Sequence, residues 1–261
     1  MTLKPIATDI EQFPGPLRPI LEGASMYDSS CSEAARVIFI DKDGGYFLKS
    51  ASYSLQGEEY MTRYFHSKGL SAEVIAYLSD EGKDWLLTRK LNGDDCIAAK
   101  YLEQPERLCG VLAESLLALH SVDCSDCLIK HSAEDYIQKA KENYARGIYN
   151  KELFPDNWGY ATPEDAWNVI RTRGHLFKTD TLLHGDYCLP NIILDDWKFS
   201  GFIDLDSGGA GDRHVDIFWG TWSLFFNLKT DKYRDRLLDA YGRSRIDEDM
   251  LRVVAAVEVF K

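Results

Sequence analysis

Short runs rich in apolar residues, bounded by polar segments that contain glycine, fill much of the first third of the chain. They occupy residues 36–40, 46–49, 74–78 and 84–88. Runs of this length between turn residues are typical of β-strands, and the spacing predicts two antiparallel hairpins. Between the hairpins, residues 58–67 predict a helix that ends near Gly69. This part of the chain therefore predicts a small β-rich lobe with one helix.

The remainder of the chain changes to a helical pattern. Residues 108–120 place apolar side chains at the three- and four-residue spacing of a buried helix. Further helices are predicted at 133–149, 163–173, 215–228, 233–241 and 247–260. Two short strands, 192–194 and 199–203, interrupt this pattern, with a turn at 195–198. A chain of 261 residues is long enough for two lobes. We expect an α+β, two-lobe fold, with a β-rich N-terminal lobe at 1–91 and a mostly helical C-terminal lobe at 92–261.

Charge and composition narrow the classes of partner. The formal net charge is −12 and the pI is near 5.0, which argues against nucleic acid because phosphates require a basic surface. An acidic chain attracts a cationic small molecule, although the same charge also serves solubility alone. No apolar run approaches the length of a membrane span, and the N-terminus lacks a signal-peptide pattern. We expect a cytoplasmic monomer that meets neither membrane nor nucleic acid.

Six cysteines are scattered along the chain and are expected to be free thiols. One cluster has the spacing of soft metal ligands, namely His120, Cys124, Cys127 and His131. A structural zinc site usually has a clearer framework of paired cysteines, so zinc is the less favoured interpretation.

The residues with the clearest chemical meaning lie in the segment 184–191 and at Asp204. Asp186 precedes Asn191 by five residues, which is the spacing of the kinase catalytic loop. In that loop the Asp accepts the proton of the substrate hydroxyl and the Asn holds a metal. Asn191 precedes Asp204 by thirteen residues, which would bring both to the open end of the hairpin 192–203 as oxygen ligands for Mg²⁺. Strand alternation would put Asp206 on the same face as Asp204, as a second possible ligand.

One further pair of residues fits the same chemistry, and two residues are predicted to support the loop. Lys49 ends a strand and Glu58 begins the next helix, an arrangement that can form the ion pair that positions ATP phosphates. His184 is predicted to be a buried histidine that braces the loop rather than a base. Asp216 is predicted to hold backbone N–H groups.

The chain resembles the aminoglycoside O-phosphotransferases of the 3′-hydroxyl class, which have a protein-kinase-like fold. The resemblance spans nearly the full length. The stretches that carry it are 31–35, 84–87, 119–123, 184–191 and 199–204. It implies a nucleotide substrate, ATP or GTP, with Mg²⁺, and a cationic aminoglycoside as acceptor.

The resemblance also implies roles for individual residues. Asp186 would position the attacking hydroxyl, Asn191 and Asp204 would bind Mg²⁺, and Lys49 would contact the nucleotide phosphates. Ser32 would lie in a nucleotide-positioning loop, and the backbone of Arg89 and Leu91 would bind adenine. The residues that match the acceptor-binding positions are Asp156, Asn157 and Glu258.

Departures from the family pattern fall where the acceptor would bind. Gly159 and Ser207 replace an acid and an arginine that are common there, Trp222 and Phe226 are apolar where charged residues are common, and Lys261 follows the matching segment 258–260. A kinase for an amino alcohol or sugar therefore remains an alternative.

A nucleotide-binding module without catalysis would be expected to lack the residues for chemistry, which are present. A metal-dependent hydrolase that uses His184, Asp186 and Asp204 would need more ligands nearby. The eleven residues between Asp204 and Asp216 leave no room for a protein-kinase activation segment.

Overall fold

The computed structural model describes residues 4–7, 9–31, 33–150 and 160–261. The chain divides into two compact units. Unit 1 contains Met1–Gly93 and Ser200–Asp206, and unit 2 contains Asp94–Phe199 and Ser207–Lys261. Each unit is described separately below.

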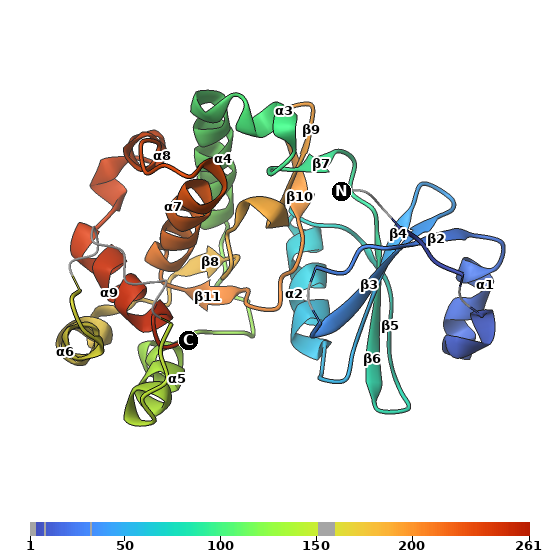
Figure 1. Ribbon diagram of the computed structural model, residues 1–261, viewed down its shortest axis with the longest axis horizontal. Coiled ribbons are helices and arrows are strands. Elements are labelled where there is room, and N and C mark those ends of the chain that lie inside the picture. Colours follow the sequence, from blue (N-terminus) through green and yellow to red (C-terminus); the bar gives the residue numbers. More distant parts are fainter. Residues whose placement is uncertain (1–3, 8, 32, 151–159) are drawn as a thin grey trace. The chain divides into compact units, whose positions relative to one another are not determined.

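Unit 1 is built on a six-stranded antiparallel sheet in the order β1-β2-β3-β4-β6-β5 (Figure 1). The strands are β1 (Lys4–Pro5), β2 (Ser25–Asp28), β3 (Ala35–Asp41), β4 (Tyr46–Ala51), β5 (Val74–Asp80) and β6 (Lys83–Arg89). The helices are η1 (Ile10–Gln12), η2 (Gly15–Leu17), α1 (Arg18–Leu21) and α2 (Gln56–Ser67). Both predicted hairpins and the predicted helix are present, each extended by one or more residues. The structure adds the segment from β1 to β2, for which the sequence analysis predicted no element.

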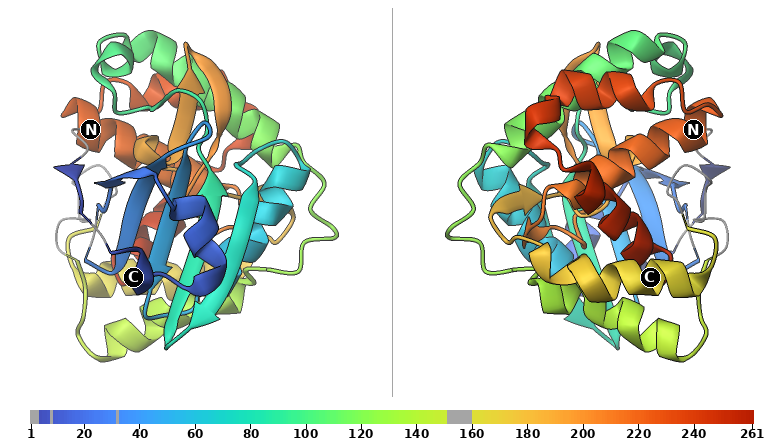
Figure 2. Two further views of the ribbon diagram at one scale, coloured as in Figure 1. Left: turned by 90° about the vertical axis from the view of Figure 1, so that its right-hand side faces the viewer. Right: turned by 90° about the vertical axis from the view of Figure 1, so that its left-hand side faces the viewer.

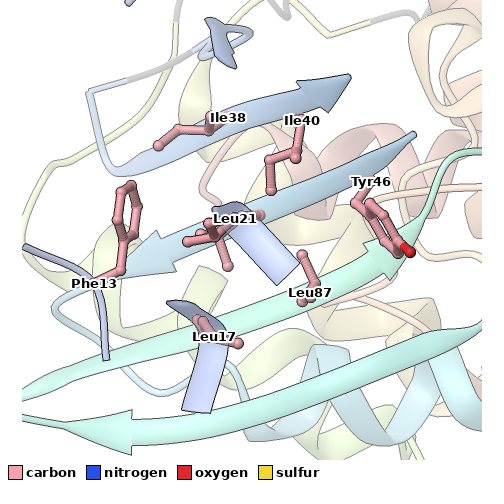
Figure 3. Close-up of a cluster of buried hydrophobic side chains, with 8 residues drawn as sticks. Phe13, Leu17, Leu21, Ile38, Ile40, Tyr46 and Leu87 are labelled. Atoms are coloured by element: carbon pink, nitrogen blue, oxygen red, sulfur yellow. The ribbon is translucent and has the colours of Figure 1, made fainter. Parts of the chain in front are cut away.

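Alternation along the strands gives the sheet two apolar faces. Ile38, Leu48 and Leu87 face Leu17 and Leu21 from the α1 region, and Figure 3 shows several members of this cluster around α1. The opposite face contributes Ala35, Ala51, Val74 and Leu86, which pack with Leu55 just before α2. The N-terminal helical segment thus covers a sheet face that would otherwise expose isoleucine and leucine side chains.

Unit 2 is mostly helical. Its main helices are α3 (Ala99–Leu102), α4 (Pro105–His120), α5 (Ala133–Ala145), α6 (Pro163–Arg173), α7 (His214–Leu228), α8 (Arg234–Tyr241) and α9 (Glu248–Glu258), with η5 (Gly174–Leu176), η6 (Leu189–Asn191) and η7 (Arg243–Arg245) between them. Helix α4 packs on α8, and α9 packs on both α6 and α7. The right-hand view of Figure 2 shows α9 (dark red) crossing α6 (yellow).

Short strands complete the unit. They are β7 (Asp94–Asp95), β8 (Thr181–Leu183), β9 (Ile192–Asp195) and β11 (Gly209–Gly211), and β10 (Lys198–Phe202) begins in unit 2 and ends in unit 1. The sheets are ordered β10-β9-β7 and β11-β8. Asp196 and Trp197 both have positive φ, at 45° and 68°, as a two-residue hairpin turn requires. The predicted turn between β9 and β10 is therefore confirmed.

The largest difference from a predicted helix boundary lies at the end of α5. Helix α5 ends at Ala145 rather than at residue 149. Gly147 has φ +68°, and the N–H of Ile148 donates to the carbonyl of Asn143. This is the Schellman arrangement that ends a helix at glycine, so Gly147 was the signal that the sequence analysis passed over.

Candidate functional site

The ion pair predicted between Lys49 and Glu58 is present in unit 1. Lys49 faces away from the α1 side of the sheet because its neighbours across the ladder are Val37 and Leu86. This is the face of the sheet on the α2 side of unit 1. Glu58 lies in the first turn of α2. The Lys49 Nζ lies 2.7 Å from Glu58 Oε2, and both side chains are largely buried. The alternation of the strand and the start of α2 thus place these two charges together.

Lys49 also contacts a second carboxylate. Its Nζ lies 2.8 Å from Asp204 Oδ1, in the part of unit 1 that follows β10. Burial alone would lower the pKa of Lys49, but the negative charges of Glu58 and Asp204 outweigh it and leave the pKa raised. Lys49 therefore stays cationic, with its charge fixed between two carboxylates.

Asp204 has an unusual backbone. Its φ is +59°, in the left-handed region that asparagine and aspartate tolerate better than most residues. Strand β10 ends at Phe202, so the strand alternation that predicted a common face for Asp204 and Asp206 does not reach these residues. The Asp204 side chain is 52% exposed, which leaves it open to a ligand from solvent.

In unit 2, Asp186 and Asn191 are brought together as the spacing predicted. The Asn191 Nδ2 donates to both the backbone carbonyl and the Oδ2 of Asp186, each at 3.0 Å. The short helix η6, which contains Pro190, turns the chain so that Asn191 comes back to Asp186. The asparagine amide thereby fixes the orientation of the carboxylate that would face a substrate hydroxyl.

The backbone of this loop is held by Asp216, as predicted. Asp216 is fully buried at the start of α7, and its two oxygens accept bonds from the N–H groups of His184 and Gly185, both at 2.8 Å. His184 is buried, and its Nδ1 accepts from the N–H of Asp186 at 3.3 Å, so its bracing role is also confirmed. Gly185 has φ +82°, and a Cβ there would lie 1.9 Å from the carbonyl oxygen of Ser207. A glycine is therefore required at this position.

Sequence analysis missed a further support behind Asp216. His120, at the end of α4, lies with Nε2 3.1 Å from Asp216 Oδ2 and with Nδ1 2.8 Å from the Tyr241 hydroxyl. These three side chains come from α4, α7 and α8, so no local pattern could reveal them. A histidine that closes an apolar helical run was the available signal.

The chain around η6 is anchored from two sides. The Ser223 hydroxyl on α7 accepts from the N–H of Leu189 at 2.9 Å, and the N–H of Cys96 donates to the carbonyls of Leu189 and Ile192. Burial, and then the negative charge of Asp186, raises the pKa of the Cys188 thiol. This loop is thus rigid, and its thiol is held in the neutral form.

The donors available for a metal are hard oxygens, which fit Mg²⁺. In Asn191 the amide nitrogen is used toward Asp186, so the Oδ1 is the atom it can offer to a cation. Asp204 supplies a half-exposed carboxylate.

The remaining predicted site residues fall into two groups. Ser32, Asp156 and Asn157 lie outside the residues that the structure describes. In unit 1, the Arg89 N–H donates to the Glu73 carbonyl and the Leu91 carbonyl accepts from Lys90 Nζ, so a base bound here would use the Arg89 carbonyl and the Leu91 N–H.

Glu258 lies at the end of α9 and is 5% exposed. It accepts from the Tyr136 hydroxyl, and the Lys261 Nζ lies 3.3 Å from its Oε1. The Lys261 ammonium also lies 4.2 Å from the centre of the Tyr136 ring. An acceptor amine at Glu258 would therefore have to replace the ammonium group of Lys261.

Two predictions concern features outside this site. Within residues 4–7, 9–31, 33–150 and 160–261, no three histidine, cysteine, aspartate or glutamate side chains come together as a metal site. His131 instead bonds the Gly208 carbonyl and Cys127 bonds the Ile129 carbonyl, which gives the zinc interpretation no support. Among the described helices, none is long and apolar enough to cross a membrane.

Comparisons with known proteins agree with this geometry. A probable aminoglycoside 3′-phosphotransferase of Lactococcus lactis is 51% identical over 260 residues, which cover 99% of this chain and 98% of the relative. An aminoglycoside 3′-phosphotransferase of Niallia circulans is 29% identical over 192 residues, 73% of each chain.

Solved structures share the fold. The crystal structure of an aminoglycoside-3′-phosphotransferase of type VIII matches with a TM-score of 0.75 and 24% identity, over 94% of this chain and 97% of the other. An aminoglycoside phosphotransferase from Streptomyces rimosus, in complex with ADP and streptomycin, matches with a TM-score of 0.74 and 19% identity, over 97% and 99%. These likenesses confirm the expected α+β, protein-kinase-like fold. A profile of the phosphotransferase enzyme family also matches residues 29–254, and the chain belongs to that family.

Proposed function

We propose that this chain is an ATP-dependent kinase that transfers the γ-phosphoryl group to the 3′-hydroxyl of an aminoglycoside antibiotic and so confers resistance. The observation that carries the proposal is the 51% identity, over nearly its whole length, to a probable aminoglycoside 3′-phosphotransferase. The Asp186–Asn191 pair and the Lys49–Glu58 ion pair support it, because phosphoryl transfer depends on positioning and on charge stabilisation.

In the proposed mechanism, Asp186 orients the acceptor hydroxyl and takes its proton as the oxygen attacks the γ-phosphorus. The bond between the γ-phosphorus and the bridging oxygen breaks, and ADP leaves with that electron pair. Asn191 holds Asp186 in place through its Nδ2, and Asp216 holds the loop backbone beneath it. Lys49, kept cationic and fixed by Glu58, binds the nucleotide phosphates.

Magnesium, bound through Asn191 and Asp204, would neutralise charge on the phosphate oxygens. The backbone of Arg89 and Leu91 would hold adenine, with GTP as an alternative nucleotide, and Ser32 would help to position the phosphates. Asp156, Asn157 and Glu258 would meet the acceptor. The proposed enzyme works as a monomer in the cytoplasm, where ATP is available, with residues 1–91 and 92–261 as its two lobes.

The test is ADP release with Mg²⁺ and ATP over a panel of acceptors. The panel contains kanamycin, neomycin, a compound that lacks the 3′-hydroxyl, and several amino alcohols. We expect turnover of kanamycin and none of the compound without that hydroxyl. Turnover of an amino alcohol but of no aminoglycoside would contradict the proposal and favour the alternative acceptor class.

The matched variants are Asp186→Asn and Asp196→Asn. Asp186→Asn keeps the size of the side chain but removes the proton acceptor, and should lower kcat by about 10²- to 10⁴-fold. Asp196 is an exposed residue in the turn between β9 and β10, with a positive φ that asparagine tolerates well, so its variant should retain activity. Equal activity in the two variants would rule out the role assigned to Asp186.

A further inference from the structure

Helix α7 carries a ladder of three aromatic side chains, Trp219, Trp222 and Phe226. The ring centres of Trp219 and Trp222 are 5.4 Å apart, and those of Trp222 and Phe226 are 5.0 Å apart in a stacked arrangement. Phe226, at the end of this aromatic ladder, is 51% exposed. About half of the surface of this apolar residue therefore faces solvent, at the end of the aromatic ladder.

The aromatic ladder lies beside the face of α7 that supports the catalytic loop. Ser223 on that face bonds the N–H of Leu189, three residues after Asp186. Residues three and four apart are neighbours on a helix surface, so Trp219 and Phe226 both flank Ser223. The ladder is thus built on the element that fixes the loop, within the same unit.

An ammonium group already occupies the exposed ring. Lys229 lies just beyond α7, with φ +57°, and its Nζ is 4.1 Å from the centre of the Phe226 ring. A cation over the face of an aromatic ring is attracted by the ring quadrupole. The contact shows that this ring face accepts an ammonium group, here from a lysine three residues further along the chain.

We propose that the Phe226 ring, backed by Trp222, is a subsite for an ammonium group of the acceptor, and that Lys229 occupies it when the acceptor is absent. The inference rests on the proposed function, because the aminoglycosides are polyamines. It deepens that function by assigning acceptor recognition to a cation–π contact. Lys229 would act as a built-in competitor that the acceptor amine displaces.

The test combines steady-state kinetics with a double-mutant cycle, using neomycin as acceptor. Phe226→Leu removes the ring but keeps an apolar side chain, and should raise the KM for neomycin by about 2- to 30-fold with a much smaller change in kcat. Phe226→Tyr keeps the ring and should leave the KM near that of the parent chain. Phe225→Leu is the matched control, because Phe225 is exposed on α7 to a similar extent, 49%, but is not the ring over which Lys229 lies, and it should leave the KM unchanged.

Substitution of Lys229 tests directly whether this lysine competes with the acceptor for the ring. Lys229→Met should lower the KM for neomycin, because the ring is then free for the acceptor. In the Phe226→Leu background the same change should have a much smaller effect, which separates competition for the ring from general repulsion between charges. Lys232→Met is the charge-matched control, since Lys232 lies over a different ring, that of Tyr233, at 5.4 Å.

Failure of the inference and failure of the proposed function can be told apart by calorimetric titration with neomycin, which needs no turnover. Phosphorylation of neomycin with the same KM in Phe226→Leu and the parent chain would overturn the subsite and leave the function intact. Neomycin binding that weakens in Phe226→Leu, without phosphorylation, would support the subsite and overturn the function. An equal effect of Lys229→Met in both backgrounds would also overturn the subsite.

Discussion

Lys49 lies within ion-pair distance of two carboxylates, those of Glu58 and Asp204, and its positive charge stabilises both of them. Replacing it by methionine leaves Glu58 buried beside another acid, Asp204. We expect Lys49→Met to lower kcat/KM for ATP by about 10²- to 10³-fold, the usual loss when one fixed electrostatic group of an active site is removed. ADP release at varied ATP measures it.

Lys83→Met is the control for this prediction, because Lys83 is exposed at the start of β6 on the same sheet. Removal of the Lys49 charge should also destabilise the fold by about 3–5 kcal/mol, since one partner of a buried pair remains without compensation. Urea unfolding of both variants separates lost activity from lost structure. Full activity in Lys49→Met would refute the role of the ion pair.

The six cysteine thiols differ in exposure, and we expect their reactivity to differ for that reason. Cys31 is exposed, whereas burial raises the pKa of the Cys96, Cys109, Cys124 and Cys188 thiols, and Cys127 is buried. We expect one thiol to react rapidly with Ellman's reagent in the native protein and all six to react in denaturant. Cys31→Ser should abolish the rapid phase. A rapid phase that survives in that variant would mean that a buried thiol is accessible.

Helices that have capping residues near their ends could be predicted closely from the sequence. Helix α6 spans the predicted residues because Thr162 and Asp165 form a capping box, Pro163 occupies the first turn, and Arg171 and Arg173 lie in the last turn. The strands β7, β8 and β11 have two or three residues each and no periodic pattern, so pairing with distant segments defines them. Such strands cannot be recognised from local sequence.

The same distinction holds for the site. Asp186 and Asn191 are five residues apart, and their spacing identifies the loop. His120 and Asp216 are 96 residues apart, and His120 and Tyr241 are 121 apart, so the support beneath the loop emerges only from packing of α4, α7 and α8. The sequence indicated Asp186, Asn191 and the neighbouring supports His184 and Asp216. Three other supports, His120, Tyr241 and Ser223, were not visible in it.

Asp212, just before α7, ties that helix to the segment that leads into β8. It accepts from the N–H groups of Lys178 and His214 and from the His214 ring. Burial alone would raise the pKa of Asp212, but these bonds and the nearby His214 hold it below its usual value. Because the pKa is lower in the folded chain than in the unfolded chain, the stabilisation is present above the ordinary carboxyl pKa of about 3.9 and is lost as the pH falls through the folded value.

We therefore expect Asp212→Asn to lower the free energy of unfolding at pH 7 by about 1–3 kcal/mol. The loss of stability below about pH 5 should also be shallower in this variant, because the group that titrates there is gone. Urea unfolding between neutral and acidic pH gives both quantities. Asp231→Asn, an exposed change before α8, is the control. Parallel pH profiles for Asp212→Asn and the parent chain would contradict the assignment.

At the scale of the whole molecule, each compact unit contains its own arrangement of fixed charged groups. Unit 1 fixes a cation between two carboxylates, and unit 2 fixes a carboxylate through an amide and a braced backbone. In the proposed reaction the first arrangement would serve the nucleotide and the second the acceptor. Binding of nucleotide and metal can then be measured without any acceptor, as a gain in stability of the whole chain.

Mg²⁺ and ADP should stabilise the chain against thermal unfolding more than ADP with a chelator does. A ligand at a hundred times its Kd adds about 2.7 kcal/mol. Asp204→Asn should lose the magnesium-dependent part of the stabilisation, since it removes a charged oxygen ligand, whereas Asp186→Asn should keep it, since that carboxylate is assigned to the hydroxyl. Asp206→Asn decides whether the neighbouring carboxylate assists, because a partial loss would make it a second ligand. Equal magnesium-dependent shifts in Asp204→Asn and the parent chain would exclude Asp204 as the ligand and require the cation to bind elsewhere.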